Sequence, residues 1–240
     1  MSKSSKSNGF TLVELLITMA VSGFIMSAIY ATYLLNQKSY HVQDDVAEMQ
    51  QNLRTVFYHL SREIRMAGFD PTNMANAGII TATASRISFS VDITDNTGNG
   101  GSDGDTDDTD ELIDFGFEPD DDTDDNGIAD SGAASLGRQT GGAGGYQPVT
   151  ENIQAIEFNY VLSDGTRTLN PSPALLNSIR AVEISILARS ARRDRDFTNT
   201  ATYTTGAGTT WGPFNDNYRR RLIITNVQCR NMGLYQKVTS

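Results

Sequence analysis

The chain has 240 residues, of which 19 are basic and 29 acidic, and its formal net charge is −10. This charge argues against a nucleic-acid-binding protein, which needs a positive surface. The single cysteine, Cys229, excludes a disulfide within the chain. We expect Cys229 to be a small buried residue at the end of a strand and not a reactive thiol, because free cysteines are among the most buried residue types.

The first predicted element is an apolar helix close to the start of the chain. Residues 10–35 read FTLVELLITMAVSGFIMSAIYATYLL and carry one charge, Glu14. A membrane span needs about 20 apolar residues, and residues 15–35 supply that length without an ionisable group. The small-residue break Asn8-Gly9 precedes the run, so cleavage there would leave the helix in the mature protein, unlike cleavage of a secretory signal. An uncleaved signal anchor is the alternative.

Glu14 argues against a simple anchor. A carboxylate in a membrane helix costs about 2.5 to 3.5 kcal/mol at the bilayer centre, and less near its edge, so it usually marks a function with a nearby partner. The best available partner is an α-amino group newly exposed by cleavage after Gly9.

Residues 1–24, MSKSSKSNGFTLVELLITMAVSGF, resemble the prepilin signal of type IV pilins and type II secretion pseudopilins. The resemblance implies that a membrane aspartyl peptidase cuts after Gly9 and methylates the new N-terminal residue, Phe10. It also implies that Glu14, the fifth residue of the mature chain, pairs with the N-terminus of a neighbouring subunit during assembly.

The helical pattern continues beyond the membrane span as an amphipathic helix over residues 37–68. Apolar residues recur at spacings of three and four, with charged residues between them. These apolar residues are Val42, Val46, Met49, Leu53, Val56, Phe57, Leu60, Ile64 and Ala67. Gly68 is a natural helix end, and Pro71 blocks continuation. One helix over residues 10–67 would be about 87 Å long at about 1.5 Å per residue.

The segment QNLRTVFYHLSREIRMAGFDP, residues 51–71, is similar to the end of the long helix in PilW-like minor pilins. Four later segments resemble the head of that family: residues 86–93, 146–166, 178–190 and 219–231. The resemblance implies a pilin architecture. Pseudopilins of the J type are similar enough to remain an alternative.

The residues after the helix, about 170, suffice for one domain. Several runs are strand-like, some with alternating apolar residues, and turn-forming Gly, Asn and Asp residues separate them. The runs are residues 86–91, 112–118, 153–162, 179–189 and 221–227. We therefore predict an α+β fold in which a long N-terminal helix, transmembrane in its first half and amphipathic in its second, packs on an antiparallel sheet. The predicted divisions are a leader (1–9), an assembly helix (10–36), the amphipathic helix (37–68) and a head (69–240) with an acidic insertion (92–137).

The negative charge is concentrated in this insertion. Residues 92–130 contain 14 Asp, 2 Glu and no Lys or Arg, whereas the rest of the chain contains 19 basic and 13 acidic residues. Such blocks are usually solvated or disordered. Nevertheless, the spacing of Asp122, Asp124, Asn126 and Asp130 places oxygen ligands at alternate positions, with Gly127 at the sixth, as in a calcium loop.

A second, weaker alternation consists of Asp103, Asp105 and Asp107, with Asp92, Asp95, Asp110 and Glu111 nearby. Neither loop is a complete EF-hand, because Ala133 occupies the twelfth position from Asp122. Hard oxygen ligands favour Ca²⁺ over Zn²⁺ or copper. We predict structural calcium in the head, and solvated acidic loops are the alternative.

Residues 189–221 contain several arginines and aromatic residues close together in sequence. This combination permits another interpretation, in which the arginines bind the phosphates of a nucleic acid and the aromatic rings stack on its bases. Because the chain is strongly acidic, we expect these arginines to line exposed strand faces or to pair with the acidic loops, and we do not expect nucleic acid as a partner. The sequence contains no G-x-S-x-G, H-E-x-x-H or P-loop motif. We therefore do not expect an enzyme.

These observations predict a PilW-like minor pilin, a structural subunit for assembly or priming of a type IV pilus. A J-type type II secretion pseudopilin is the alternative, and a calcium-dependent adhesin anchored by one helix is the contrasting class. The implied partners are other pilins through the N-terminal helix, the prepilin peptidase and the inner membrane. Before assembly the chain would cross the bacterial inner membrane once, with the head outside the cytoplasm; afterwards it would lie in the fibre or pseudopilus.

Overall fold

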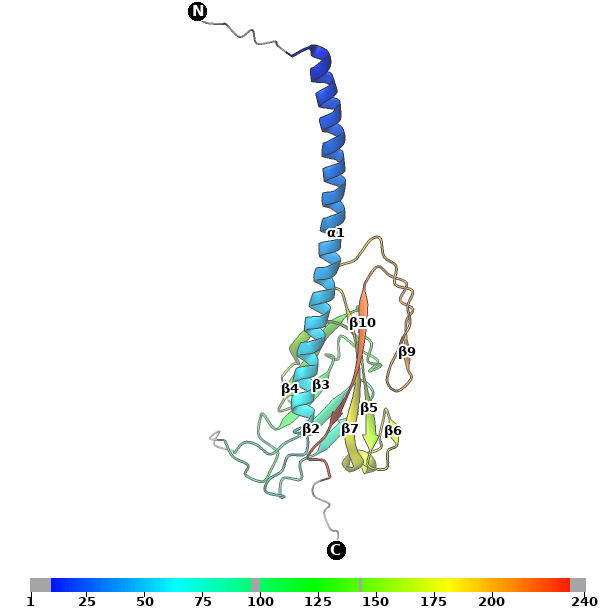
Figure 1. The fold of residues 1–240 in the computed structure, drawn as a ribbon. Helices are drawn as coiled ribbons and strands as arrows, with labels where there is room; N and C mark the ends of the chain where they lie inside the picture. The colour runs from blue at the N-terminus through cyan, green and yellow to red at the C-terminus, as the bar shows by residue number, and fades with distance from the viewer. Residues whose placement is uncertain (1–9, 96–99, 143, 234–240) are drawn as a thin grey trace, which may run out of the picture. The chain divides into compact units, whose positions relative to one another are not determined.

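The computed structural model describes residues 10–95, 100–142 and 144–233 (Figure 1). The chain divides into two compact units at Asp44/Asp45. A single helix, α1 (Leu12–Ile64), runs through this boundary. It contains no proline and is rich in long unbranched and γ-branched side chains, which lose little rotamer freedom in a helix. The predicted continuous helix is therefore confirmed, with ends only two or three residues inside the predicted ones.

The first unit contains the apolar part of α1. Every residue from Phe10 to His41 is exposed, and the large apolar side chains include Leu34 at 49% and Phe24 at 79% exposure. Among the residues that the structure describes, α1 is the one helix long and apolar enough to cross a membrane. Its apolar surface surrounds the helix instead of forming one stripe, which is typical of a membrane span.

In the second unit, the end of α1 buries one stripe of side chains. The stripe consists of Asp45, Met49, Leu53, Val56, Leu60 and Ile64. Their spacing confirms the predicted amphipathic helix. The chain leaves the helix at Gly68, whose φ of +75° is left-handed and whose N–H donates to the carbonyl of Ser90 at 3.0 Å. Glycine accepts this conformation without a steric penalty, as predicted for the helix end.

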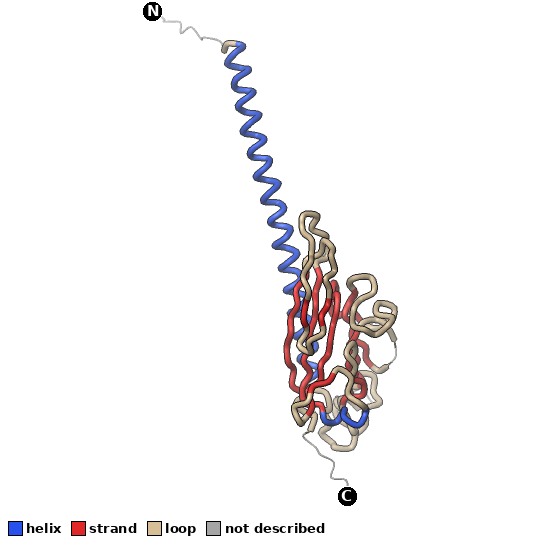
Figure 2. Tube along the Cα trace, turned by 90° about the vertical axis from the view of Figure 1, so that its right-hand side faces the viewer, coloured by secondary structure: helices blue, strands red, loops and turns tan. Residues whose placement is uncertain are grey.

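Within the described residues, eight strands form one antiparallel sheet in the order β1-β2-β3-β4-β5-β7-β10, with β6 paired to β5. Figure 2 shows the strands side by side as one layer. The strands are β1 (Ile79–Ala82), β2 (Ile87–Ser90), β3 (Leu112–Gly116), β4 (Ala134–Thr140), β5 (Gln147–Leu162), β6 (Arg167–Thr168), β7 (Ile179–Arg189) and β10 (Arg220–Gln228). A short 3₁₀ helix, η1 (Pro173–Ser178), precedes β7, and a hairpin of β8 (Tyr203–Thr204) and β9 (Thr210–Trp211) stands apart from the sheet.

One face of the sheet forms the main core with the stripe of α1. Leu53 and Leu60 belong to the same buried cluster as Phe158 of β5 and Ile184 of β7. The alternate residues of β7 that the sequence singles out, Val182, Ile184 and Ile186, are all fully buried. Burial of this apolar area, worth about 25 cal/mol per Å², holds the helix on the sheet. The predicted α+β fold is confirmed.

The other face of the central strands is also covered. Trp211 of β9 forms a second buried cluster with Ala155 of β5 and Leu187 of β7. The segment between β7 and β10, residues 190–219, therefore lies over this face as a flap, which explains why β7 is buried along both faces. Cys229, directly after β10, is 3% exposed, which confirms the prediction of a buried thiol.

Candidate functional site

The assembly helix, residues 10–36, begins with a closed ring of hydrogen bonds at the start of α1. Oε2 of Glu14 accepts hydrogen bonds from the backbone N–H and the hydroxyl of Thr11, both at 2.9 Å, while the N–H of Glu14 donates to the Thr11 hydroxyl at 3.3 Å. This is a capping box, in which two otherwise unpaired N–H groups are satisfied reciprocally. The spacing Thr-x-x-Glu is legible in the sequence, so Thr11 could have been predicted as the cap. Phe10 is exposed, and Gly9 lies outside the described residues.

The first predicted calcium loop, residues 122–130, closes through its own hydrogen bonds. The two carboxylate oxygens of Asp122 accept from the N–H groups of Asn126 (3.0 Å) and Gly127 (2.9 Å). Asp124 and Asn126 accept further bonds within the loop, and Asp130 accepts from the N–H and hydroxyl of Thr123. Burial raises the pKa of Asp122, whereas the hydrogen bonds from Thr123 lower that of Asp130.

The second predicted loop is more open. The N–H of Asp105 donates to Asp103, and that of Asp107 donates to Asp105 at 3.2 Å. A hydrogen bond with Asp105 and the charge of that side chain raise the pKa of Asp107. Over residues 10–95, 100–142 and 144–233, no group of three or more His, Cys, Asp or Glu side chains is arranged to hold a metal ion. Calcium in these loops therefore stays a prediction.

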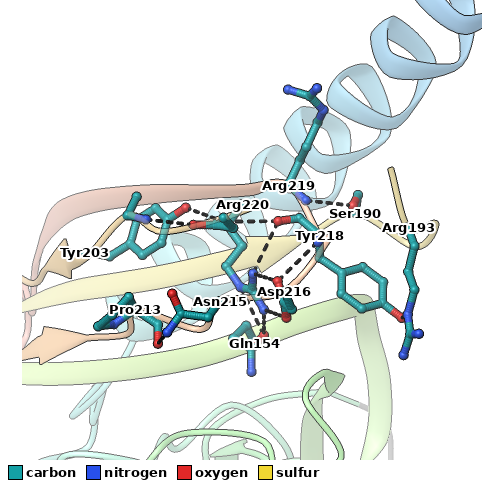
Figure 3. A network of polar contacts seen from close by, with 12 residues as sticks. Gln154, Ser190, Arg193, Tyr203, Pro213, Asn215, Asp216, Tyr218, Arg219 and Arg220 are labelled. Carbon is teal, nitrogen blue, oxygen red and sulfur yellow. Dashed lines mark hydrogen bonds and ion pairs between the residues drawn. The ribbon is translucent and has the colours of Figure 1, made fainter. Parts of the chain in front are cut away.

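The arginine-rich segment forms a polar network within the flap (Figure 3). The guanidinium of Arg220 donates two hydrogen bonds of 2.6 Å to the carboxylate of Asp216 and one of 2.8 Å to Oε1 of Gln154. The side chain of Arg220 is 1% exposed, so its charge depends on the carboxylate of Asp216 for compensation. Arg219 likewise pairs with Asp194 at 2.7 Å. The network ties the flap to β5 and β10.

Aromatic rings of the same segment occupy the faces of the guanidinium groups. Arg189 lies 4.0 Å from the ring centre of Tyr218, Arg219 lies 4.4 Å from Phe197, and Arg220 lies 4.1 Å from Phe214. These cation–π contacts add to the ion pairs. The arginines that suggested nucleic-acid binding are thus engaged mainly with aromatic and acidic partners of their own segment. The sequence predicted that they line exposed strand faces or pair with the acidic loops; the ion pairs of Arg219 and Arg220 are instead with Asp194 and Asp216.

Asp216→Asn is expected to destabilise the head by about 2 to 4 kcal/mol at neutral pH, because it leaves the buried guanidinium of Arg220 without a counter-charge. Water reduces this cost in part, since the side chain of Asp216 is 33% exposed. The hydrogen bonds from Arg220 lower the pKa of Asp216 below its ordinary value of 3.8. The carboxylate therefore stabilises the fold fully above that value, and its contribution is lost as pH falls through the lowered pKa.

The measurement is the free energy of unfolding at several pH values. The difference between wild type and Asp216→Asn should be large at pH 7 and shrink in acid. Asp120→Asn, at an exposed position, is the matched control and should change little at any pH. An equal loss for both variants would contradict a special role for the Arg220 pair.

Two family profiles and one solved structure are similar to this chain. The profile of the prokaryotic N-terminal methylation motif matches residues 4–30, and that of the family described as Type IV Pilus-assembly protein W matches residues 124–231. Among solved structures, the chain is similar to the type IV-like pilin TTHA1219 from Thermus thermophilus, with a TM-score of 0.47 and 16% identity over 76% of this chain and 96% of that one. No curated protein matches the chain.

The methylation motif at the start of an exposed apolar helix, together with the sheet-bearing head, defines a type IV pilin-like protein. Within that class, the head is similar to the pilus-assembly protein W family over residues 124–231. Membership of this class implies processing by the prepilin peptidase and interaction with other pilus components. Pilins are structural subunits and are not normally enzymes.

Proposed function

We propose that the mature chain begins at N-methyl-Phe10 and serves as a structural subunit that assembles into, or primes, a type IV pilus. The observation that carries this proposal is the apolar surface over residues 10–35, all of which are exposed. Apolar surface of this extent is unfavourable in water by about 25 cal/mol per Å². It therefore belongs in a bilayer before assembly and among the helices of other pilins afterwards.

The location follows from the same helix. Before assembly, α1 would cross the inner membrane once, with the head outside the cytoplasm. The leader carries Lys3 and Lys6, and positive residues next to a span favour the cytoplasmic side. The J-type pseudopilin uses the same helix, but the match of residues 124–231 to the pilus-assembly family favours the pilus.

In this proposal Glu14 provides the docking charge. The carboxylate lies at the exposed start of the helix, four residues from Phe10, where the α-amino group of a neighbouring subunit could reach it. Such a pair in a low-dielectric environment is worth more than a surface ion pair, although desolvation offsets much of the gain. The pair would select the axial position of each new subunit.

We also propose calcium in the loop of residues 122–130. Support comes from the alternate oxygen-bearing side chains and from the turn at Gly127, which has a left-handed φ of +78°. The two oxygens of Asp122 accept one hydrogen bond each, which leaves a second lone pair on both for a cation. Asp130 accepts both of its bonds from Thr123 on Oδ2, so its Oδ1 is the atom that could bind a cation. The double variant Asp122→Asn/Asp124→Asn tests this loop, and it should bind Ca²⁺ more weakly than wild type when binding is measured by calorimetry.

Mass spectrometry of the protein from sheared pili and from membranes tests processing and incorporation together. We expect a mature mass that begins at Phe10 with one added methyl group in both fractions. Cleavage removes nine residues, including two lysines, so the mature chain should also migrate at a more acidic isoelectric point. A chain that retains Met1, or that begins beyond Leu35, would contradict the proposal.

A further inference from the structure

Four buried oxygen atoms in the acidic insertion have no hydrogen-bond partner among the described residues. They are Oδ1 of Asp92, Oγ1 of Thr94, Oδ2 of Asp108 and Oε2 of Glu111. Asp92 and Glu111 are both fully buried, at 0% exposure. An unpartnered carboxylate oxygen is among the costliest groups to bury, and such groups usually indicate a missing proton, water or ion.

Three of these oxygens come from side chains that lie together beyond the paired ends of β2 and β3. Oε1 of Glu111 accepts from the N–H groups of Ile93 (2.8 Å) and Thr94 (2.9 Å), so that only Oε2 lacks a partner. The N–H of Glu111 donates to the carbonyl of Asp108 at 3.1 Å. The Thr94 hydroxyl lies beside the Asp108 carboxylate, outside a well-formed hydrogen bond but close enough to lower its pKa. The backbone therefore holds two carboxylates and one hydroxyl close to one another.

The surroundings of this group are negatively charged. Between Arg86 and Arg138 the sequence has no basic residue, and the carboxylates of Glu111 and Asp103 both act on Asp108. Partial burial, reinforced by these two charges, raises the pKa of Asp108. A cation would remove both the repulsion and the unsatisfied oxygens, whereas a proton shared between the two carboxylates would remove only part of each.

We propose that Ca²⁺ binds to Asp108, Glu111 and the hydroxyl of Thr94, and that it ties the connection between β2 and β3 to the body of the head. Two carboxylates and a hydroxyl are an all-oxygen set, and Ca²⁺ accepts the irregular geometry and the additional waters that complete its six to eight ligands, whereas Mg²⁺ requires a near-ideal octahedron. The charge of Asp103 acts on Asp108 from outside this set. Asp108 and Thr94 belong to neither loop predicted from the sequence, whereas Glu111 is one of the residues named near the second loop.

The cation proposed here is independent of pilus assembly, so its absence would leave the assembly role untouched. The experiment uses the full chain, purified in detergent and freed of metal with a chelator. Thermal melting is followed in Ca²⁺, in Mg²⁺ and in chelator, and the dissociation constant for Ca²⁺ is measured by calorimetry. We expect a rise in melting temperature that is larger in Ca²⁺ than in Mg²⁺.

Glu111→Gln keeps the oxygen that accepts from Ile93 and Thr94 but removes the charge, and Asp108→Asn makes the same change at a half-exposed position where misfolding is less of a risk. Each is expected to weaken Ca²⁺ binding at least tenfold and to remove most of the calcium-dependent rise. Asp120→Asn, at an exposed position of the same acidic insertion outside both predicted loops, makes the same change in net charge and should leave both readouts unchanged.

The double variant Asp122→Asn/Asp124→Asn separates this site from the loop of residues 122–130. Retention of the tight Ca²⁺ site in the double variant, together with its loss in Asp108→Asn, would support the site at Asp108 and Glu111. The inference is overturned if wild type melts equally in calcium and in chelator, or if only the double variant loses binding. It is also overturned if Glu111→Gln stabilises the chelated protein while Ca²⁺ has no effect, because the carboxylates then share a proton.

Discussion

Replacing Glu14 by alanine is expected to leave the protein in the inner membrane and to lower its incorporation into pili at least tenfold. Membrane insertion should persist, because removal of a carboxylate makes the span more apolar. Incorporation should fall, because the α-amino group of a neighbouring subunit would be left in the membrane without its counter-charge. A tenfold loss corresponds to about 1.4 kcal/mol, a modest share of what an uncompensated charge costs in such a setting. The measurement is the amount of the subunit in sheared pili relative to membranes.

The capping box supplies the control for this experiment. Thr11→Ala removes the hydroxyl that bonds Glu14 but keeps the carboxylate, at a cost of about 1 kcal/mol to the first turn. We expect Thr11→Ala to assemble nearly as well as wild type, and Glu14→Gln, which keeps an acceptor but no charge, to behave like Glu14→Ala. Equal defects in Thr11→Ala and Glu14→Ala would mean that Glu14 acts only as a cap. Normal incorporation of Glu14→Ala would exclude an assembly role.

Gly127→Ala is expected to destabilise the head by about 3 to 5 kcal/mol. The residue has φ of +78°, which costs a non-glycine residue about 1 to 2 kcal/mol, and a Cβ there would collide with the carbonyl oxygen of Ile156 in β5. The approach is close because the Gly127 carbonyl accepts from the N–H of Ile156 at 2.8 Å. Backbone atoms of a central strand cannot move aside cheaply, so overpacking adds to the conformational cost.

Gly165→Ala isolates the conformational part of this cost. Gly165 has a similar φ of +85°, but a Cβ there would meet no atom within 4 Å. The loss should therefore be about 1 kcal/mol, and denaturant titration of the two variants measures the difference directly. A loss at Gly127 no larger than that at Gly165 would show that the loop of residues 122–130 can move away from β5. The sequence singled out Gly127 as the turn of a calcium loop, whereas its close approach to a strand is sufficient to require glycine.

The elements predicted most accurately are those with long, regular apolar patterns. The helix was predicted from its continuous apolar run and the stripe that follows, and β7 was predicted with both ends correct. In contrast, β4 has few apolar residues and an internal glycine, Gly137, and its place is set by pairing with β3 and β5. The start of β5 at Gln147 was missed for the same reason, because its first residues are polar and include Pro148. Such strands are defined by distant partners, which a local pattern does not contain.

The candidate sites divide in the same way. The bond between Thr11 and Glu14 joins residues three positions apart, and its spacing is legible in the sequence. The pair of Asp216 and Arg220 is also local, four positions apart, but spacing alone did not identify it because many acidic residues were available to the arginines. The contact of Arg220 with Gln154 joins residues 66 positions apart, and the unpartnered oxygens of Asp108 and Glu111 depend on how the chain curls back over Glu111. The acidic composition identifies residues 92–130 as the candidate region from the sequence. Which of its carboxylates are buried and lack partners depends on the fold.

The buried thiol of Cys229 gives the head a built-in reporter. Burial raises the pKa of Cys229 to about 12, so at neutral pH roughly one molecule in 100,000 carries the reactive thiolate. The residue follows the edge strand β10, where its N–H donates to the carbonyl of Arg180 at 2.9 Å. A thiol reagent would therefore label it only when this end of the sheet opens, and because the chain has one cysteine, every label is assigned without engineering. The labelling rate would measure the opening of the head in membranes and in assembled fibres, where calorimetry cannot resolve a single subunit.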